Sequence, residues 1–150
     1  MRLGAHMSIA GGVENAVLRG QSVGCDAIAM FTKNNNQWKA KKLTKEDADK
    51  FNAALIETGI KPVVAHTSYL INVASPAAAL WKKSIASMED ELTRCELLGI
   101  PYLVLHPGSH MKKGIDYGIQ RAAEAFNRIH EKLPNLRVMT LLEHTAGPNM

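Results

Sequence analysis

The sequence PVVAHTSYLINVASPAAALWKKSIASMEDELTRCELLGIPYLVLH spans residues 62–106 and contains the pattern that determines the fold. Two short apolar runs, PVVAH (62–66) and PYLVLH (101–106), have the length and composition of buried β-strands. Between them, residues 76–98 form a longer amphipathic stretch that ends at Gly99, as is typical of a helix C-terminus. A strand, a helix and a second strand in this order predict a parallel pair with a right-handed crossover.

The same alternation continues on both sides of this unit. Thr44 and Asp47 give one helix a start close to a capping box, and Gly59 ends it. No internal repeat or flexible linker interrupts the pattern. We expect further strands at residues 2–6, 26–31 and 136–143, and further helices at residues 13–23, 45–58 and 117–133.

Strict alternation of strands and helices indicates an α/β fold with a parallel sheet. A complete (β/α)8 TIM barrel takes about 250 residues, or about 31 for each unit. Five strands and four helices therefore account for nearly all of the 150 residues. We predict that residues 1–150 form the first five strands and four helices of a TIM barrel, as its N-terminal half. A doubly wound sheet of flavodoxin type is the alternative, although that fold normally closes with a helix after strand five.

The composition is that of an ordinary globular domain. Hydrophobic residues make up 46% and charged residues 21% of the chain, which excludes the disordered, collagen-like and coiled-coil classes. The net charge of +4 suits a polyanionic partner. Cys25 and Cys95 lie far apart and form no zinc-binding cysteine pair. Because the sequence shows neither a secretory signal nor a run of about 20 apolar residues, we expect a cytoplasmic protein without a membrane partner.

Polar side chains, most of them able to bind metal, occur where the predicted strands end. The C-terminal ends of parallel strands share one rim, and α/β active sites are built at that rim. Imidazole and carboxylate groups are ordinary ligands of zinc, manganese and iron. The pattern therefore predicts a metal site made of strand-end residues. These residues are His6, Thr32, His66, His106 and Glu143, of which His66, His106 and Glu143 are the expected ligands.

Two further histidines have simpler interpretations. His110 lies four residues beyond the predicted 101–106 strand. It either orients His106 through a hydrogen bond or is an ordinary surface residue. His130 falls within the predicted 117–133 helix, away from the rim, and we expect it to be structural.

The first loop at the predicted rim, TKNNNQW (32–38), carries side chains suited to nucleic acid. Lys33, Asn34 and Gln37 offer ammonium and amide donors, which suit phosphate oxygens and the edges of bases. A solvated turn is the alternative interpretation.

The second rim loop, TSYLIN (67–72), places apolar side chains where solvent is expected. Exposed side chains of this kind are costly unless the fold buries them or they act as a wedge between bases. We expect Ile71 in the core and regard Tyr69 and Leu70 as the wedge candidates.

Five segments resemble, in order and spacing, the motifs of the endonuclease IV family of zinc-dependent apurinic/apyrimidinic endonucleases. The resemblance implies a TIM barrel with a three-zinc site. It also implies hydrolysis of the phosphodiester bond on the 5′ side of an abasic site in duplex DNA, as a step of base excision repair. The segments are GAHMSIAGG (4–12), FTKNNNQW (31–38), AHTSYLINVASP (65–76), LHPGSH (105–110) and LLEHTAG (141–147).

The resemblance further implies roles for individual residues. His66 and His106 resemble the ligands of one zinc. Glu143 resembles the catalytic carboxylate that bridges this zinc to a second. Tyr69 and Leu70 match loop residues that enter the minor groove at the lesion. Gln37 matches a DNA-contacting loop residue, and His6, which lies in the first-strand motif, has a supporting role at the mouth of the site. From the residues themselves we add Asn34 and Lys33 as neighbouring DNA contacts and His110 as a supporting candidate.

The chain departs from the family pattern at two positions. Asn36 stands where the family often has arginine, and His144 stands where asparagine usually follows the glutamate. Family members are also longer, and their remaining ligands come from strands that these residues do not include. We therefore expect at most part of a three-zinc site and little or no incision by this chain alone.

Two other functions are open at this point. A sugar isomerase or epimerase of the related barrel type also gathers histidine and glutamate around a metal at strand ends. A non-catalytic half-barrel would bind DNA or self-associate through its open sheet edges. The amide-rich loop and the Tyr-Leu loop favour the endonuclease, because a small sugar needs no wedge.

Overall fold

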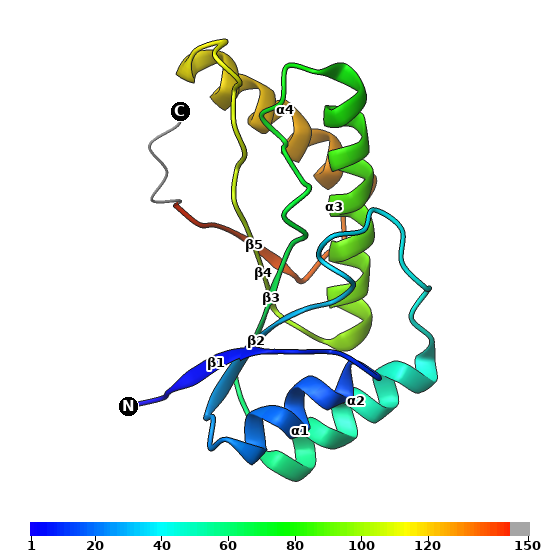
Figure 1. Ribbon diagram of the computed structural model, residues 1–150. Helices are drawn as coiled ribbons and strands as arrows, with labels where there is room; N and C mark the ends of the chain where they lie inside the picture. The colour runs from blue at the N-terminus through cyan, green and yellow to red at the C-terminus, as the bar shows by residue number, and fades with distance from the viewer. Residues whose placement is uncertain (145–150) are drawn as a thin grey trace.

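A computed structural model describes residues 1–144 of the chain (Figure 1). Residues 145–147, at the end of the LLEHTAG motif, lie outside this range. Strands and helices alternate along the sequence. The elements are β1 (Gly4–Met7), α1 (Glu14–Ser22), β2 (Ala27–Phe31), α2 (Lys45–Thr58), β3 (Val63–His66), α3 (Ala78–Leu98), β4 (Tyr102–Leu105), α4 (Ile115–Lys132) and β5 (Met139–Leu142).

The five strands form one parallel sheet in the order β1-β2-β3-β4-β5. Sequential order is the order of a barrel, whereas a flavodoxin-type sheet places its first strand between the second and the third. The predicted partial TIM barrel is therefore confirmed and the doubly wound alternative is excluded. Along one side of the sheet α1 packs on α2, α2 on α3, and α3 on α4 (Figure 1).

The hydrophobic core lies between the sheet and this layer of helices. Strand residues alternate between buried and half-buried positions in β2, β3 and β4, as the two faces of a pleated sheet require. The buried set packs against helix side chains such as Phe51, Met88 and Ile129. The other set, which includes Phe31, Val64 and Val104, lines the concave side that becomes the inside of a barrel.

Helix α2 shows how closely local signals determined the boundaries. The Asp47 backbone N–H donates to Thr44 Oγ1 at 3.1 Å, and the Thr44 N–H donates to Asp47 Oδ2 at 2.8 Å. This is the expected capping box. Gly59 ends the helix with φ +70°, a left-handed conformation that favours glycine. The helix over 45–58 is confirmed residue for residue.

The outer elements differ from their predicted bounds. β1 covers Gly4–Met7 instead of 2–6, and β5 covers Met139–Leu142 instead of 136–143. Both are edge strands, so each is defined by pairing with a single neighbour among the described residues. α4 begins at Ile115, two residues before the predicted start, directly after Gly114 with φ +99°. Apolar pattern alone does not show where pairing or a turn begins.

Candidate metal centre

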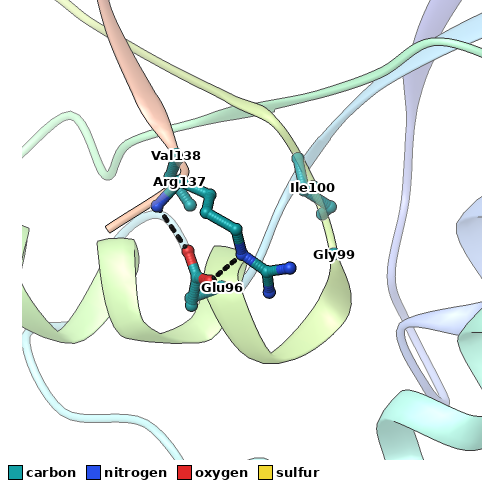
Figure 2. Close-up of a pocket in the computed structure, with 5 residues that line it drawn as sticks. All are labelled: Glu96, Gly99, Ile100, Arg137 and Val138. Carbon is teal, nitrogen blue, oxygen red and sulfur yellow. Dashed lines mark hydrogen bonds and ion pairs between the residues drawn. The ribbon is translucent and has the colours of Figure 1, made fainter. Parts of the chain in front are cut away.

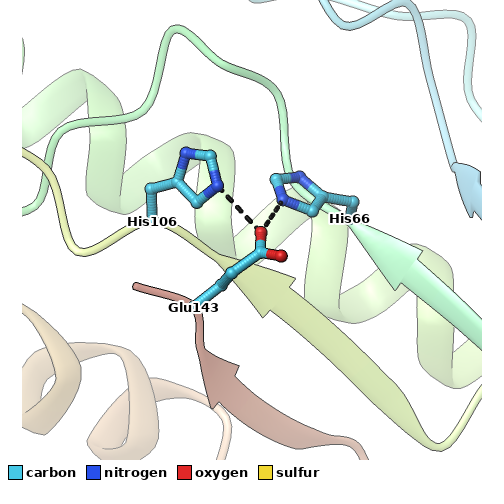
Figure 3. Close-up of side chains that lie close together, drawn as sticks. All are labelled: His66, His106 and Glu143. Atoms are coloured by element: carbon cyan, nitrogen blue, oxygen red, sulfur yellow. Dashed lines mark hydrogen bonds and ion pairs between the residues drawn. The ribbon is translucent and has the colours of Figure 1, made fainter. Parts of the chain in front are cut away.

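Three potential metal ligands lie together at the C-terminal rim of the sheet (Figure 3). His66 is the last residue of β3, His106 directly follows β4, and Glu143 directly follows β5. The parallel register aligns His66 with Val104, and Val104 with Leu141. Since residues two apart along a strand share a face, His66, His106 and Glu143 all project from the concave side. The sheet thus places ligands from distant sequence positions in one small volume.

The distances within this group are those of direct contact. His66 Nε2 lies 3.0 Å from Glu143 Oε2, and His106 Nε2 lies 2.8 Å from the same oxygen (Figure 3). One ligand atom from each residue lies within 4.8 Å of the others. Two zinc bonds of about 2.1 Å at a tetrahedral angle place their donor atoms about 3.4 Å apart. The two contacts to Glu143 therefore lie within a few tenths of an ångström of the separation that a shared cation requires.

Electrostatics and hydrogen bonding prepare the group for a cation. The hydrogen bonds from His66 and His106 lower the pKa of Glu143, so its carboxylate is ionised at neutral pH. His66 Nδ1 lies 2.9 Å from the Thr67 carbonyl oxygen, and this contact turns Nε2 toward the centre of the group. The side chain of His66 is 15% exposed and that of Glu143 is 51% exposed. Two nitrogen donors and one carboxylate oxygen, open to solvent on one side, suit zinc, manganese or iron.

Comparison with known proteins agrees with the fold. Residues 18–150 match the xylose isomerase-like TIM barrel family. The chain belongs to this family. A Chloroflexus aurantiacus protein named probable endonuclease 4 is 51% identical over 146 residues, which are 97% of this chain and 51% of the relative. A Geobacter protein of the same name is 47% identical over 145 residues, again 97% of this chain and 51% of the relative.

Solved structures of this TIM barrel family divide into near and distant neighbours. Endonuclease IV from Thermus thermophilus superposes with a TM-score of 0.86 and 35% identity, over 99% of this chain and 54% of that one. A D-psicose 3-epimerase superposes with a TM-score of 0.69 but only 16% identity, over 95% of this chain and 52% of that one, so it shares the fold alone. The resemblance to endonuclease IV is confirmed. The chain spans about half the length of the curated relatives it matches.

His6 lies beside His66, His106 and Glu143 without belonging to the candidate metal site. Its ring packs on Phe31 at a tilt of 45° with centroids 4.4 Å apart, and the rings of Phe31 and His66 meet edge to face with centroids 5.9 Å apart. Partial burial of the ring, followed by the charge of His66, lowers the pKa of His6. A neutral ring that packs in this aromatic cluster agrees with the predicted supporting position, and its role stays a prediction.

His110 does not orient His106. Its Nδ1 accepts a hydrogen bond from the Gly114 N–H at 3.1 Å, just before α4 begins. The alternative in which His110 orients His106 is therefore not observed, since its Nδ1 is bonded to the backbone at the start of α4. His130 is exposed on α4 and lies away from the rim, as expected.

Lys33 is buried, which contradicts the prediction that it contacts DNA. The residue is only 3% exposed. Its ammonium group donates to Ser87 Oγ at 2.9 Å and to Asp90 Oδ2 at 3.0 Å. Because Ser87 and Asp90 follow Lys33 by more than fifty residues, loop composition gave no sign of this burial. Asn34 and Gln37 of the same loop are exposed and remain candidate contacts.

The second rim loop places Ile71 in the core, as predicted, while the wedge role of Tyr69 and Leu70 stays a prediction. Ile71 is 6% exposed and belongs to the core, whereas Tyr69 is 61% exposed. Leu70 is half-buried. The Tyr69 ring lies 5.8 Å from that of His66 and 6.4 Å from that of His106, between centroids. An exposed aromatic ring therefore stands directly beside the metal-binding group.

Asn72 is a site residue that sequence analysis did not identify. Its Nδ2 donates to the Ser109 carbonyl at 3.0 Å, and its Oδ1 accepts from the Ser109 N–H at 3.1 Å. The amide thus joins the loop after β3 to the loop after β4. Gly108 is required beside it, because a Cβ at that position would lie 2.1 Å from Asn72 Oδ1. A glycine that follows Pro107 was the one sequence signal for this close approach.

The opposite end of the sheet holds a small cavity of about 160 Å³ (Figure 2). It lies where β4 and β5 begin, and it is lined by Glu96, Gly99, Ile100, Arg137 and Val138. The Arg137 backbone N–H and Nε donate to the Glu96 carboxylate at 3.0 and 2.6 Å. These bonds fasten the start of β5 to the end of α3. They engage both carboxylate oxygens, so the charge of Glu96 is paired with that of Arg137.

Helices in the described part of the chain, residues 1–144, are all too short or too polar to cross a membrane.

Proposed function

We propose that this chain is part of a DNA repair endonuclease that hydrolyses the phosphodiester bond 5′ to an abasic site in duplex DNA. The observation that carries this proposal is the convergence of His66, His106 and Glu143 beside the exposed ring of Tyr69. The relatives named probable endonuclease 4 support it, since about half of each is matched at 51% and 47% identity.

The chemistry of phosphodiester hydrolysis requires what this group of side chains is suited to hold. A hydrolase needs a nucleophile at neutral pH and a positive charge near the phosphate oxygens. When bound, zinc lowers the pKa of a coordinated water to about 7 and neutralises phosphate charge. His66 and His106 would hold the metal through their Nε2 atoms. Glu143 would contribute Oε2 to the same ion, and its second oxygen would be available to a neighbouring ion.

The loops around the metal-binding group supply the proposed DNA contacts. Gln37 and Asn34 are exposed amides on the loop after β2, and Tyr69 and Leu70 follow β3. An aromatic or aliphatic wedge enters a duplex most easily where a base is missing, because little stacking is lost there. The net charge of +4 favours approach to the DNA backbone. The concave face thus combines a metal site with a surface suited to a damaged duplex.

We expect the 150-residue chain to bind metal and abasic DNA but to show little or no incision. It contributes three ligands, whereas the resemblance implies a three-zinc site that needs more. β1 and β5 each have one neighbouring strand within the described residues, so both sheet edges offer free hydrogen-bonding groups. Self-association through these edges is the expected behaviour in solution, and light scattering measures it.

The proposed function is tested by DNA binding and incision with zinc present. A labelled duplex that contains a tetrahydrofuran abasic analogue should bind more tightly than the intact duplex of the same sequence. His106→Ala should lose zinc binding, while His130→Ala, at an exposed position on α4, should retain it. Equal affinity for the two duplexes would contradict the proposal. Epimerisation of a ketose such as D-fructose by the chain would favour the sugar-epimerase alternative instead.

A further inference from the structure

A polar stripe on α3 lies behind the two rim loops. Its members follow the spacing i, i+3, i+4 and i+7, which places them on one face of the helix. Most of this face is buried, and Glu91 is 0% exposed. Charged residues are rarely buried unless they are paired. The stripe consists of Ser87, Asp90, Glu91 and Arg94.

The stripe holds the first rim loop from within. The Lys33 ammonium bonds to Ser87 and Asp90, lies 3.6 Å from Glu91 Oε1, and reaches the Trp38 carbonyl oxygen at 3.4 Å. One amine therefore connects the start of the loop to its end and to the helix.

Arg94 extends this attachment to the residues that flank the loop. Its Nε and Nη2 donate to the Thr32 carbonyl at 3.1 and 2.9 Å, and its Nη1 donates to the Lys41 carbonyl at 3.0 Å. Thr32 lies at the end of β2 and Lys41 lies beyond Trp38. The backbone is therefore fixed on both sides of the exposed residues Asn34 and Gln37.

Glu91 also holds the second rim loop. The Ser68 N–H donates to Glu91 Oε1 at 3.1 Å, and Ser68 Oγ donates to the Asn35 carbonyl at 2.7 Å. The same carboxylate oxygen thus faces Lys33 of one loop and Ser68 of the other. Ser68 directly precedes the exposed Tyr69.

Apolar side chains of similar size would stabilise this interface equally well, because buried ion pairs add little net stability. Directional bonds do something that apolar contacts do not: they fix the orientation of each loop backbone. We propose that Glu91 is a positioning residue that, together with Lys33, holds the 32–38 and 67–72 loops at one separation. This inference rests on the proposed function, in that the separation sets the preference for an abasic duplex over an intact one.

Coupling between the loops is testable without DNA. Lys39, Lys41 and Lys42 are exposed beyond the first loop, so trypsin cleavage there reports how firmly the loop is held. Ser68 lies on the 67–72 loop, and Ser68→Ala removes its hydrogen bond to the Asn35 carbonyl. We expect both Ser68→Ala and Glu91→Gln to raise the rate of trypsin cleavage about fivefold. Thr93→Ala, at an exposed α3 position off the stripe, is the control and should leave the rate unchanged.

The functional consequence is measured by fluorescence anisotropy with the full chain. Lys33→Met should lower the ratio of affinities for the abasic-analogue and intact duplexes about fivefold. Glu91→Gln keeps an oxygen that accepts from the Ser68 N–H, so the ratio of affinities should fall less in this variant. Cobalt(II) affinity, measured from the d–d absorption of the ion when His66, His106 and Glu143 bind it, should equal that of the wild type in both variants. If a variant only lowers the free energy of unfolding, the ratio of the two DNA affinities and the anisotropy amplitude should both stay unchanged at temperatures where the chain is folded.

The outcomes separate this inference from the proposed function. Unchanged trypsin cleavage in Ser68→Ala and Glu91→Gln overturns the positioning role, whatever the DNA result. A wild-type chain without preference for the abasic duplex overturns the proposed function, while the cleavage assay still decides whether the loops are coupled. If Lys33→Met fails to fold, Glu91→Gln supplies both measurements.

Discussion

At the carboxyl end of the sheet, His66, His106 and Glu143 converge on the concave side beside an exposed tyrosine, whereas at the amino end Arg137 and Glu96 bond to each other (Figures 2 and 3). Both clusters join residues that are distant in sequence. The first leaves donor atoms open to a cation, while the second pairs opposite charges. This difference follows the division in TIM barrels between a functional face at strand C-termini and a stabilising face at strand N-termini.

The largest expected effect is the loss of metal binding at the carboxyl end. His66→Ala removes one of three ligands, and we expect zinc affinity to fall by about 100-fold or more. Isothermal titration calorimetry in the presence of a competing chelator measures this. His130→Ala is the matched control. Affinity that persists in His66→Ala would show that the metal binds elsewhere.

The second effect concerns the buried carboxylate behind the rim. Burial raises the pKa of Glu91 to about 7, against the partial opposition of Ser68 and Lys33. Between pH 7 and the ordinary value of 4.5, the folded state holds a proton that the unfolded state has lost. The contribution of Glu91 to the free energy of unfolding therefore increases as the pH falls from about 7 to 4.5, by on the order of 3 kcal/mol.

Urea unfolding at several pH values tests the sign of this dependence. Glutamine does not titrate, so Glu91→Gln should lack this pH dependence. The unfolding free energy of the wild type should therefore rise relative to that of the variant from about pH 8 to about pH 5. Glu57→Gln, at an exposed position on α2, should follow the wild type. A difference that stays constant with pH would mean that Glu91 keeps one charge state throughout.

The third effect separates DNA recognition from metal binding at the same rim. Tyr69→Ala removes an exposed ring, and we expect affinity for the abasic-analogue duplex to fall about tenfold. Zinc affinity should be unchanged, since Tyr69 is not a ligand. Tyr117→Ala on α4 controls for the loss of an aromatic ring. Weaker binding of zinc in Tyr69→Ala would assign the ring to the metal site instead.

The smallest effect is expected at the amino end. Arg137→Ala breaks a largely exposed ion pair, and such pairs contribute about 1 kcal/mol or less. Chemical denaturation should show this modest loss, and both zinc and DNA affinities should equal those of the wild type. A large effect on either affinity would remove the contrast between the two ends.

Local sequence signals predicted most of the fold. Helix 45–58 carried its capping box and its terminal glycine within the sequence, and the strand over 62–66 ended in a polar residue. Convergence of His66, His106 and Glu143 also followed from sequence, because parallel strands impose a common direction on their ends. These inferences needed only neighbouring residues and one rule of topology.

Lys33 was misplaced, and Asn72 was missed, because the partner of each lies in a distant stretch of the sequence. Lys33 looked like a solvent-exposed cation because its loop is polar, yet Ser87 and Asp90 enclose it. Asn72 was missed because its partner, Ser109, belongs to the next β–α unit, and Gly108 was the one sequence signal for this contact. For His110 the sequence left two interpretations open, and its hydrogen bond from the Gly114 N–H favours the one without a role at His106. Sequence spacing thus predicted the convergence of three strand-end side chains but not the groups that hold the loops.

The two acceptors around His66 have a consequence for how a metal ion enters. The Thr67 carbonyl oxygen lies 2.9 Å from Nδ1, so Nε2 is the ring atom that faces Glu143, at 3.0 Å from Oε2. A metal ion and a proton would compete for this one nitrogen. Loading with metal should therefore weaken as the solution becomes more acidic, because metal ligands must be deprotonated.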